Sequence, residues 1–464
     1  MLSICDRQGR FGRREFLTIG SLGLGGLTLP GLFATRALGA PANRLVRDRA
    51  IVFLFMQGGP TQFETFDPKM TAPVEIRSTT GEVATSLPGI TFGGTFPKLA
   101  RLADRLTIVR SFQTGDSKHD VKPIVSKESA NASLGAIYAR VAGAMHPQTG
   151  MPTSAALYPH SILADSSRPP MGFGSLVDPG PLGGGYAPFV PGVSGEMQEA
   201  MRLNLPRQRL DDRRALLAQL DRLSRRLAAT GAFEGVDKFY EQAFQTILGG
   251  VADAFDLSDE DPRIVARYDT SGLVHPASIN TRWSNYQRYI DHGQSLGKLM
   301  LLARRLCEAG CGFVTVSTNF VWDSHADKNN AGVQENMDYV GSPFDHAVST
   351  FLEDVESRGL SDKIMLVCCG EMGRTPRINA RGGRDHWGNL APLIMAGGGL
   401  PRGKVIGQST RSGGEPLTEP VTIRHLTATL MRSVFDIGKL RLVRDIPPEV
   451  MRAITEGEPI PGLS

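Results

Sequence analysis

The chain has 464 residues, a formal net charge of +4 and a hydrophobic content of 41%. A chain of this size and composition can bury a large core, as one domain with an insertion or as two domains, which excludes a mostly disordered protein. Basic runs interleaved with aromatic residues, the usual footprint of nucleic-acid binding, do not occur in the sequence. We therefore expect neither DNA nor RNA as a partner.

The first 39 residues have the pattern of an export signal. Arg13 and Arg14 follow a polar, basic stretch and precede a glycine-rich apolar run over 19–33, which is the order typical of a twin-arginine signal peptide. The run is shorter than the roughly twenty apolar residues that a membrane-spanning helix needs. We expect cleavage after Gly39 and export to the periplasm through the twin-arginine translocase; a structural N-terminal helix is the alternative. Removing 1–39 deletes five arginines and two acidic residues, which lowers the net charge from +4 to +1.

Five short apolar runs predict buried strands, at 51–56, 106–109, 313–316, 364–369 and 393–396. They are rich in β-branched residues and do not alternate with polar ones, as expected for a sheet covered on both faces. Apolar residues at helical spacing predict helices over 295–309 and 344–358. Strands that alternate with helices indicate a doubly wound, mostly parallel α/β sheet sandwiched by helices, and we assign 40–464 to one such domain.

The segment over roughly 150–285 differs from the rest of the chain in composition and in the pattern of its apolar residues, and it is predicted to be an insertion into that domain. Residues 151–195 are rich in proline and glycine, which indicates a long irregular excursion. Leucines at helical spacing predict a helix over 207–230 that packs on the core. Cys307 and Cys311 lie one helical turn apart, and buried helix packing explains them better than a disulfide or a metal site.

Unusual polar residues follow the predicted strands. In open parallel sheets, ligands bind beyond the carboxyl ends of the strands. The residues at these positions are 57–67 after the first strand, His119 and Asp120 after the second, 322–325 after the third, 370–376 after the fourth and 383–388 before the fifth. A site at this edge of the sheet is therefore expected.

Several of these residues are potential metal ligands. Asp323 and His325 are two positions apart, so in an extended segment both side chains leave the same face. Asp385 and His386 are adjacent, so that one can ligate while the other orients it, and Glu371 adds a third carboxylate. Mixed imidazole and carboxylate ligands favour Zn²⁺, Mn²⁺ or Fe over Ca²⁺. Each motif alone also fits a cap or a turn, but their occurrence at successive strand ends favours a site for a divalent metal.

At these positions the chain resembles the bacterial family of unknown function DUF1501, which is placed in the alkaline phosphatase and sulfatase superfamily. The resemblance runs from about residue 51 to residue 435. It rests on 58–61, 65–68, 303–306, 322–325, 370–376, 383–387 and 396–399. It implies an alkaline-phosphatase-like fold, a small anionic ester as substrate, a core that commonly holds two metal ions, and hydrolysis of phosphate or sulfate esters. DUF1501 itself has no settled activity.

The resemblance also assigns roles. Asp323 and His325 resemble the aspartate and histidine ligand pair of the superfamily, and Glu371 stands where the next strand ends in a ligand. Asp385 and His386 resemble the later ligands.

Departures from the superfamily pattern concern the first strand and the C-terminal part. Gln57 stands where active phosphatases carry an aspartate ligand, so Asp67 or Glu64 would have to replace it. His425 and Thr427 stand where an aspartate and a histidine are expected, and 408–410 lacks the expected aspartate.

Four further residues are candidates for catalysis or anion binding. Thr61, just beyond the first strand, offers a hydroxyl that a metal could activate as nucleophile, with a helix N-cap as the alternative; Ser111 is a poorer candidate. Arg374 and Arg384 flank the proposed ligands and could clamp a tetrahedral anion, or form surface ion pairs instead. Two functions follow: a periplasmic metal-dependent ester hydrolase, or a superfamily member without turnover that acts as a binding or accessory protein of the cell envelope. The oligomeric state stays open.

Overall fold

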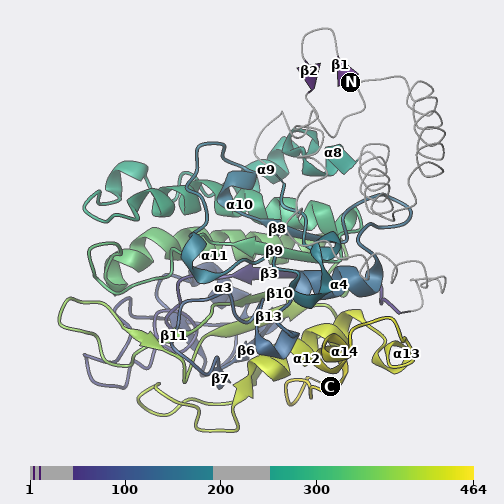
Figure 1. Ribbon diagram of the computed structural model, residues 1–464. Helices are drawn as coiled ribbons and strands as arrows, with labels where there is room; N and C mark the ends of the chain where they lie inside the picture. Colours follow the sequence, from purple (N-terminus) through teal and green to yellow (C-terminus); the bar gives the residue numbers. More distant parts are fainter. Residues whose placement is uncertain (1–3, 6–9, 12–44, 192–250, 464) are drawn as a thin grey trace, which may run out of the picture.

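The protein is described here by a computed structural model that places residues 4–5, 10–11, 45–191 and 251–463 (Figure 1). The helix predicted over 207–230 and most of the expected signal peptide lie outside these residues. No helix within the described ranges is long and apolar enough to cross a membrane.

The centre of the fold is a seven-stranded sheet with the order β14-β6-β13-β10-β3-β9-β8. Its strands are β3 (Ala50–Phe55), β6 (Leu106–Val109), β8 (Ser154–Leu157), β9 (Phe313–Ser317), β10 (Ile364–Cys369), β13 (Leu393–Gly397) and β14 (Lys404–Ile406). β13 is antiparallel to both of its neighbours, and all other pairings are parallel. The predicted α/β class with a mostly parallel sheet is confirmed, as are the five predicted strands.

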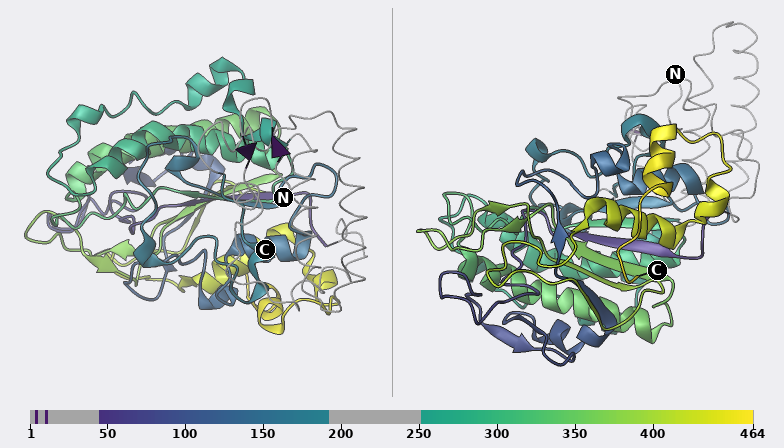
Figure 2. Two further views of the ribbon diagram at one scale, coloured as in Figure 1. Left: turned by 45° about the horizontal axis from the view of Figure 1, so that its top comes forward. Right: turned by 90° about the horizontal axis from the view of Figure 1, so that it is seen from below.

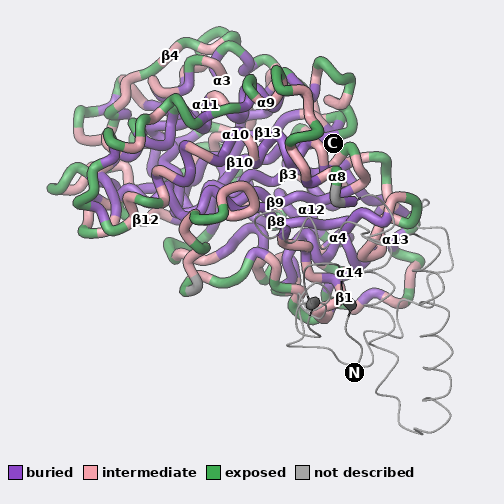
Figure 3. The backbone as a smooth tube through the Cα atoms, turned by 90° about the horizontal axis from the view of Figure 1, so that it is seen from above, coloured by how far each residue is buried: buried purple, intermediate pink, exposed green. Residues whose placement is uncertain are grey.

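Two helical layers cover the sheet (Figures 1 and 2). Val52 and Leu54 of β3 belong to a core shared with α10 and α11, whereas Ile51, Phe53 and Phe55 belong to a core shared with α4 and α12. Alternate side chains of a strand point to opposite faces, so an uninterrupted apolar strand supplies both cores at once. Figure 3 shows this buried interior surrounded by exposed loops.

The first layer contains α3 (Pro97–Arg101), α8 (Val251–Phe255), α9 (Pro262–Tyr268), α10 (Tyr286–Glu308) and α11 (Val333–Ser357). The second contains α4 (Leu134–Ala142), α12 (Ile423–Val434), α13 (Ile437–Leu440) and α14 (Pro448–Thr455). Both predicted helices are present, but α10 and α11 begin well before the predicted starts. In α11, Pro343 lies inside the helix, and packing against α10 keeps the helix continuous although proline lacks a backbone N–H donor.

Short elements complete the described chain. The 3-10 helices are η2 (Ala103–Arg105), η3 (Lys127–Ser129), η4 (Pro159–Ser161), η5 (Met171–Phe173), η6 (Gly180–Leu182), η7 (Gly184–Tyr186), η8 (Leu257–Asp259) and η9 (Pro276–Ser278). The small strands are β1 (Ile4–Cys5), β2 (Arg10–Phe11), β4 (Glu82–Ala84), β5 (Thr91–Gly93), β7 (Phe112–Gln113), β11 (Gly373–Arg374), β12 (His386–Trp387) and β15 (Val421–Thr422). Within 151–191, where an irregular path is expected, the regular elements are the strand β8 and the short 3-10 helices η4–η7. The thiols of Cys307 and Cys311 are free.

Candidate metal centre

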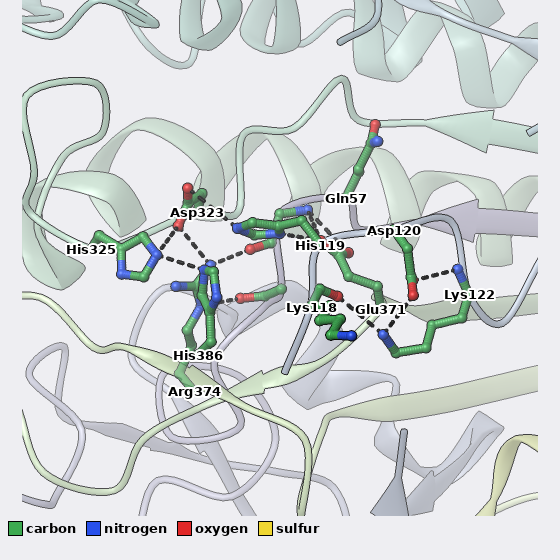
Figure 4. A network of polar contacts seen from close by, with 12 residues as sticks. Gln57, Lys118, His119, Asp120, Lys122, Asp323, His325, Glu371, Arg374 and His386 are labelled. Carbon is green, nitrogen blue, oxygen red and sulfur yellow. Dashed lines mark hydrogen bonds and ion pairs between the residues drawn. The ribbon is translucent and has the colours of Figure 1, made fainter. Parts of the chain in front are cut away.

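Four side chains converge at the carboxyl edge of the sheet: His119, Asp323, His325 and His386 (Figure 4). One potential ligand atom from each lies within 4.8 Å of those of the other three. His119 follows β7, Asp323 and His325 follow β9, and His386 belongs to β12, which precedes the antiparallel strand β13. Because β13 runs opposite to its neighbours, the segment before it reaches the edge where β9 and β10 end. We call these four residues the tetrad.

The distances within the tetrad are those of a small coordination site. His325 Nε2 lies 2.6 Å from His386 Nε2 and 3.4 Å from Asp323 Oδ1, and His119 Nε2 lies 3.6 Å from Asp323 Oδ2. Zinc–nitrogen bonds of about 2.0–2.1 Å in tetrahedral geometry put ligand atoms about 3.3 Å apart. The observed separations bracket that value, so a divalent ion fits between these atoms after small side-chain adjustments.

Three tetrad members favour the protonation state that binds metal. Burial, followed by the nearby charge of Arg374, lowers the pKa of His386 to about 3, and the same two causes lower the pKa of His325. Burial alone would raise the pKa of Asp323, but Arg374 and the histidines outweigh it and lower that pKa well below its usual value. Neutral imidazoles and an ionised carboxylate are the forms that coordinate metals.

His119 is oriented by a buried carboxylate. Its Nδ1 lies 2.8 Å from Glu371 Oε1, and the backbone N–H of Gly58 donates to both oxygens of Glu371 at 3.0 and 3.1 Å. With its Nδ1 proton held by Glu371, His119 directs the buried Nε2 at the other three members of the tetrad. This Nε2 has no hydrogen-bond partner among the described residues. A buried nitrogen without a partner, aimed at three other ligand atoms, is suited to bind a metal ion.

The pKa of His119, unlike that of the other two histidines, is raised. Burial lowers the pKa of its imidazole, but the carboxylates of Asp323 and Glu371 outweigh burial and raise the pKa. In the metal-free protein, His119 is thus the tetrad member that most readily carries an extra proton.

A buried lysine shapes the loop that carries His119. Lys122 Nζ lies 2.8 Å from Asp116 Oδ1 and 2.9 Å from Asp120 Oδ2, and it donates to the carbonyl of Lys118 at 3.0 Å (Figure 4). These contacts close the loop on both sides of His119. Asp120, which follows His119 at the predicted strand end, therefore pairs with Lys122.

Two predicted ligands lie behind the tetrad. Glu371 contacts His119, as described above. Asp385 has a half-exposed side chain whose Oδ1 lies 3.5 Å from His325 Nδ1 and accepts a hydrogen bond of 3.0 Å from Asn379 Nδ2. A carboxylate hydrogen-bonded to the second ring nitrogen of a ligating histidine, as Glu371 is to His119, fixes the orientation of that histidine.

The predicted anion clamp Arg374 is fully buried and directed at protein atoms. Its Nη2 lies 2.8 Å from Asp323 Oδ1, Nε donates to the carbonyl of Gly59 at 2.7 Å and Nη1 to that of Arg384 at 3.1 Å. These contacts fix Asp323 and the turn after β3. Binding of a substrate anion by Arg374 stays a prediction.

The turn after β3 is held by interactions of its own. Thr61 Oγ1 donates to Glu64 Oε2 at 2.6 Å and accepts from the backbone N–H of Phe63 at 3.2 Å, a local pattern like that of a cap. Glu64 forms a fully buried ion pair with Arg384 at 3.0 Å. A nucleophilic role for Thr61 stays a prediction.

Asp67, a predicted metal ligand, is not part of the tetrad. Its carboxylate pairs with Lys69 at 3.2 Å and Arg110 at 3.6 Å, and Ser409 Oγ donates to it. Asp67 is thus engaged by two cations elsewhere in the fold. Gln57, for which Asp67 was expected to substitute, packs its side chain beside Ser317, whose Oγ lies 3.4 Å from Gln57 Oε1.

Two glycines of the predicted motifs allow the site to close. Gly58 has φ of +114°, and a Cβ there would lie 2.5 Å from the backbone nitrogen of Asp323; a Cβ on Gly383 would lie 2.2 Å from the backbone carbon of His325. Only glycine tolerates such approaches. These residues bring the turn after β3 and the segment before β12 against the Asp323–His325 segment.

The sequence indicated His119 as a polar residue at a strand end but did not identify it as a ligand. The available signal was its position after the second strand, in the same relation to the sheet as Asp323. His425, by contrast, lies on α12, where its Nδ1 accepts from the backbone N–H of Thr422 at 3.1 Å and so caps that helix.

Comparison with curated proteins finds no sequence match. Three of the solved structures that match are distant in sequence and in structure. Lipoteichoic acid synthase LtaP from Listeria monocytogenes is 7% identical, with a TM-score of 0.31 over 77% of this chain and 68% of its own. Phosphonate monoester hydrolase SpPMH from Silicibacter pomeroyi is 10% identical, with 0.33 over 83% and 73%. PsFucS1 sulfatase from Pseudoalteromonas sp. is 12% identical, with 0.31 over 93% and 76%.

Likenesses at these identities and TM-scores carry no argument about the activity of this chain. The family comparison is more extensive, because it spans most of the chain and includes every member of the tetrad. Residues 48–439 match the family described as "Protein of unknown function (DUF1501)", and the protein therefore belongs to that family.

Proposed function

We propose that the protein is a metal-dependent hydrolase of phosphate, sulfate or related esters that works in the periplasm. The observation that carries the proposal is the tetrad, in which three imidazoles and one carboxylate converge on one point at the edge of the sheet. Within the described residues one group of this kind occurs, so the proposal is for one ion at this position. The donor set suits Zn²⁺, Mn²⁺ or Fe.

The surrounding residues would hold the ligands in place. Glu371 keeps the proton on His119 Nδ1, and Asp385 stands behind His325. Asp323 is fixed from two sides, by Arg374 at Oδ1 and by Asn330 Nδ2 at Oδ2, each at 2.8 Å. A divalent ion bound there would act as a Lewis acid that polarises an oxygen of the ester.

One observation supports the alternative, a binding or accessory protein without turnover. The hydroxyl of Thr61 and the guanidinium of Arg374, two of the residues predicted to act on substrate, are both hydrogen-bonded to other protein groups. A metal centre without an available nucleophile would still bind an anion. The two functions therefore share the metal and differ in turnover.

Hydrolysis of p-nitrophenyl phosphate and p-nitrophenyl sulfate by the purified mature protein tests the proposal. We expect metal-dependent turnover of at least one of them, abolished by a chelator and restored by Zn²⁺, Mn²⁺ or Fe²⁺. His325→Ala should lower that turnover by at least about 100-fold, because a ligand is lost. His160→Ala removes another partly buried histidine that is not part of the tetrad, and it should leave turnover unchanged.

Two outcomes count against hydrolysis. Turnover that survives both the chelator and His325→Ala would show that the tetrad is not the active site. A protein that binds metal but hydrolyses neither ester would favour the accessory function.

Export through the twin-arginine translocase is the second part of the proposal, and it rests on the signal pattern of the first 39 residues, in which Arg13 and Arg14 precede the apolar run over 19–33. Replacing both with lysine should leave the precursor in the cytoplasm, because the translocase recognises the arginine pair. Cell fractionation measures this, with Arg36→Lys, a change near the expected cleavage site, as the matched control. Normal periplasmic amounts of the double variant would refute this route.

A further inference from the structure

Two phenylalanines flank the tetrad on the side of His119. The ring centroids of Phe173 and Phe320 lie 5.2 and 4.7 Å from that of His119. The two phenyl rings stack on each other at 4.7 Å with an interplanar angle of 11°. Phe320 is buried, whereas Phe173 is partly exposed. The Phe173–Phe320 pair is therefore a stack of two apolar rings beside the tetrad, in which Phe173 is the ring open to solvent.

The turn that carries Phe320 has an unusual backbone. Asn319 and Phe320 have φ of 55° and 69°, and positive φ is a genuine outlier for a bulky residue such as phenylalanine. The turn is tied down by hydrogen bonds from Asn319 Nδ2 to the carbonyl of Ser167 at 2.9 Å and from the Asn319 backbone N–H to Ser317 Oγ at 3.1 Å. Strained turns that the surroundings hold in place occur preferentially at ligand sites.

Phe173 comes from the insertion rather than from the sheet. It ends η5, and Gly174 follows with φ of +96°. A Cβ on Gly174 would lie 3.0 Å from Val121 Cγ2, so the insertion packs against the loop that carries His119. The irregular segment thus supplies a side chain to the candidate site.

The Phe173–Phe320 pair also borders a cation. Arg288 of α10 has its Cζ 5.9 Å from the centroid of Phe320, and its Nη1 donates to the carbonyl of Asn319 at 3.4 Å. Arg288 forms no direct ion pair with an acidic side chain in the described part of the chain, although the charge of Asp291 on the same helix acts on it. A partly buried cation of this kind makes the ring pair more suitable for an anion with an aromatic body than for a cationic ligand.

We propose that the Phe173–Phe320 pair is a substrate subsite that stacks against an aromatic group of the anion held at the tetrad, so that aryl esters are preferred over alkyl esters. Flat rings recognise one another through offset or edge contacts at such distances. Phe320, fixed by the strained turn, is the rigid part of the subsite, and Phe173 is the part that a ligand can reach. The proposal rests on the proposed function only in that the anion binds at the tetrad.

Binding of phenylphosphonate and methylphosphonate to the metal-loaded mature protein, measured by calorimetry, tests the subsite without requiring turnover. We expect the wild type to bind phenylphosphonate about 3- to 10-fold more tightly, the size of a typical aromatic contact. Phe173→Leu should remove this preference, and Phe173→Tyr should keep it. Phe189→Leu should keep it as well, because Phe189 is a partly buried ring of the same insertion that packs on Phe255 instead.

Equal affinities of the wild type for the two phosphonates, or no binding of either, would overturn the subsite. A preference that survives in Phe173→Leu would overturn it too. A protein that shows the expected preference but hydrolyses no ester would contradict the hydrolase function and still support the subsite. The failure of one proposal can therefore be distinguished from the failure of the other.

Discussion

Replacing Arg384 with methionine should lower the free energy of unfolding by about 3–5 kcal/mol, because it leaves Glu64 as an unpaired charge in the interior. Both side chains are fully buried. The guanidinium binds the carboxylate at two points, Nη2 to Oε1 at 3.0 Å and Nε to Oε2 at 3.1 Å. It also donates to the carbonyls of Ile76 and Arg77, which lose their partner in the variant.

Urea denaturation of the wild type and the variant measures this change, and Arg402→Met provides the matched control. Arg402 pairs with Glu356 at 2.7 Å, but its side chain is 54% exposed, so we expect a loss below about 1 kcal/mol. The double variant Arg384→Met with Glu64→Gln should recover part of the stability, since the uncompensated charge is removed. Equal losses for Arg384→Met and Arg402→Met would contradict a buried structural ion pair.

Much of the fold could be predicted because its central strands are buried on both faces. An uninterrupted apolar run such as β3 is a signal of that burial, and it is visible without any long-range information. β8 and β14 were missed because neither gives a long apolar run. β8, at one edge of the sheet, is buried but contains the small residues Ser154, Ala155 and Ala156, and β14, at the other edge, has only three residues and none of them is fully buried.

The candidate site was predictable only to the extent that strand ends define it. Asp323, His325 and His386 follow from that rule and from the motifs, and the structure brings all three into the tetrad. Only the fold shows that His119 belongs to the tetrad and that Glu371 contacts His119 instead. The two residues are 252 positions apart, so the sequence does not reveal their contact.

Asp67 illustrates the same limit. Its nearness to the first strand made it a reasonable substitute for the aspartate that Gln57 replaces. Its partners Arg110 and Ser409 come from distant parts of the chain, and such pairings cannot be read from local spacing. Arg384 and Glu64, 320 positions apart, were likewise not foreseeable as a pair.

Replacing His386 with alanine should abolish stable metal binding, because it removes one of four ligands and opens the tetrad to water. His386 lies 2.6 Å from His325, so no neighbouring side chain of the tetrad can take its place without leaving its own. Its pKa of about 3 keeps the imidazole neutral over the physiological range. Its contribution to metal affinity should therefore not change near neutral pH.

The pH dependence of metal binding should instead follow His119. Because the pKa of His119 is raised, a proton occupies it in the metal-free protein at higher pH than it occupies His325 or His386. Metal affinity should be constant above that pKa and fall as the pH drops through it, with one proton displaced for each ion bound. If the fall in metal affinity with decreasing pH involved the uptake of several protons at once, it would contradict the assignment of the pH dependence to His119.

Metal content of the purified mature protein, determined by inductively coupled plasma mass spectrometry at neutral pH, tests the metal centre most directly. The wild type and the control His160→Ala should carry a stoichiometric divalent transition metal, and His386→Ala should carry essentially none while remaining folded by circular dichroism. Equal metal in the wild type and His386→Ala, or no metal in the wild type after incubation with Zn²⁺, Mn²⁺ or Fe²⁺, would contradict the metal centre.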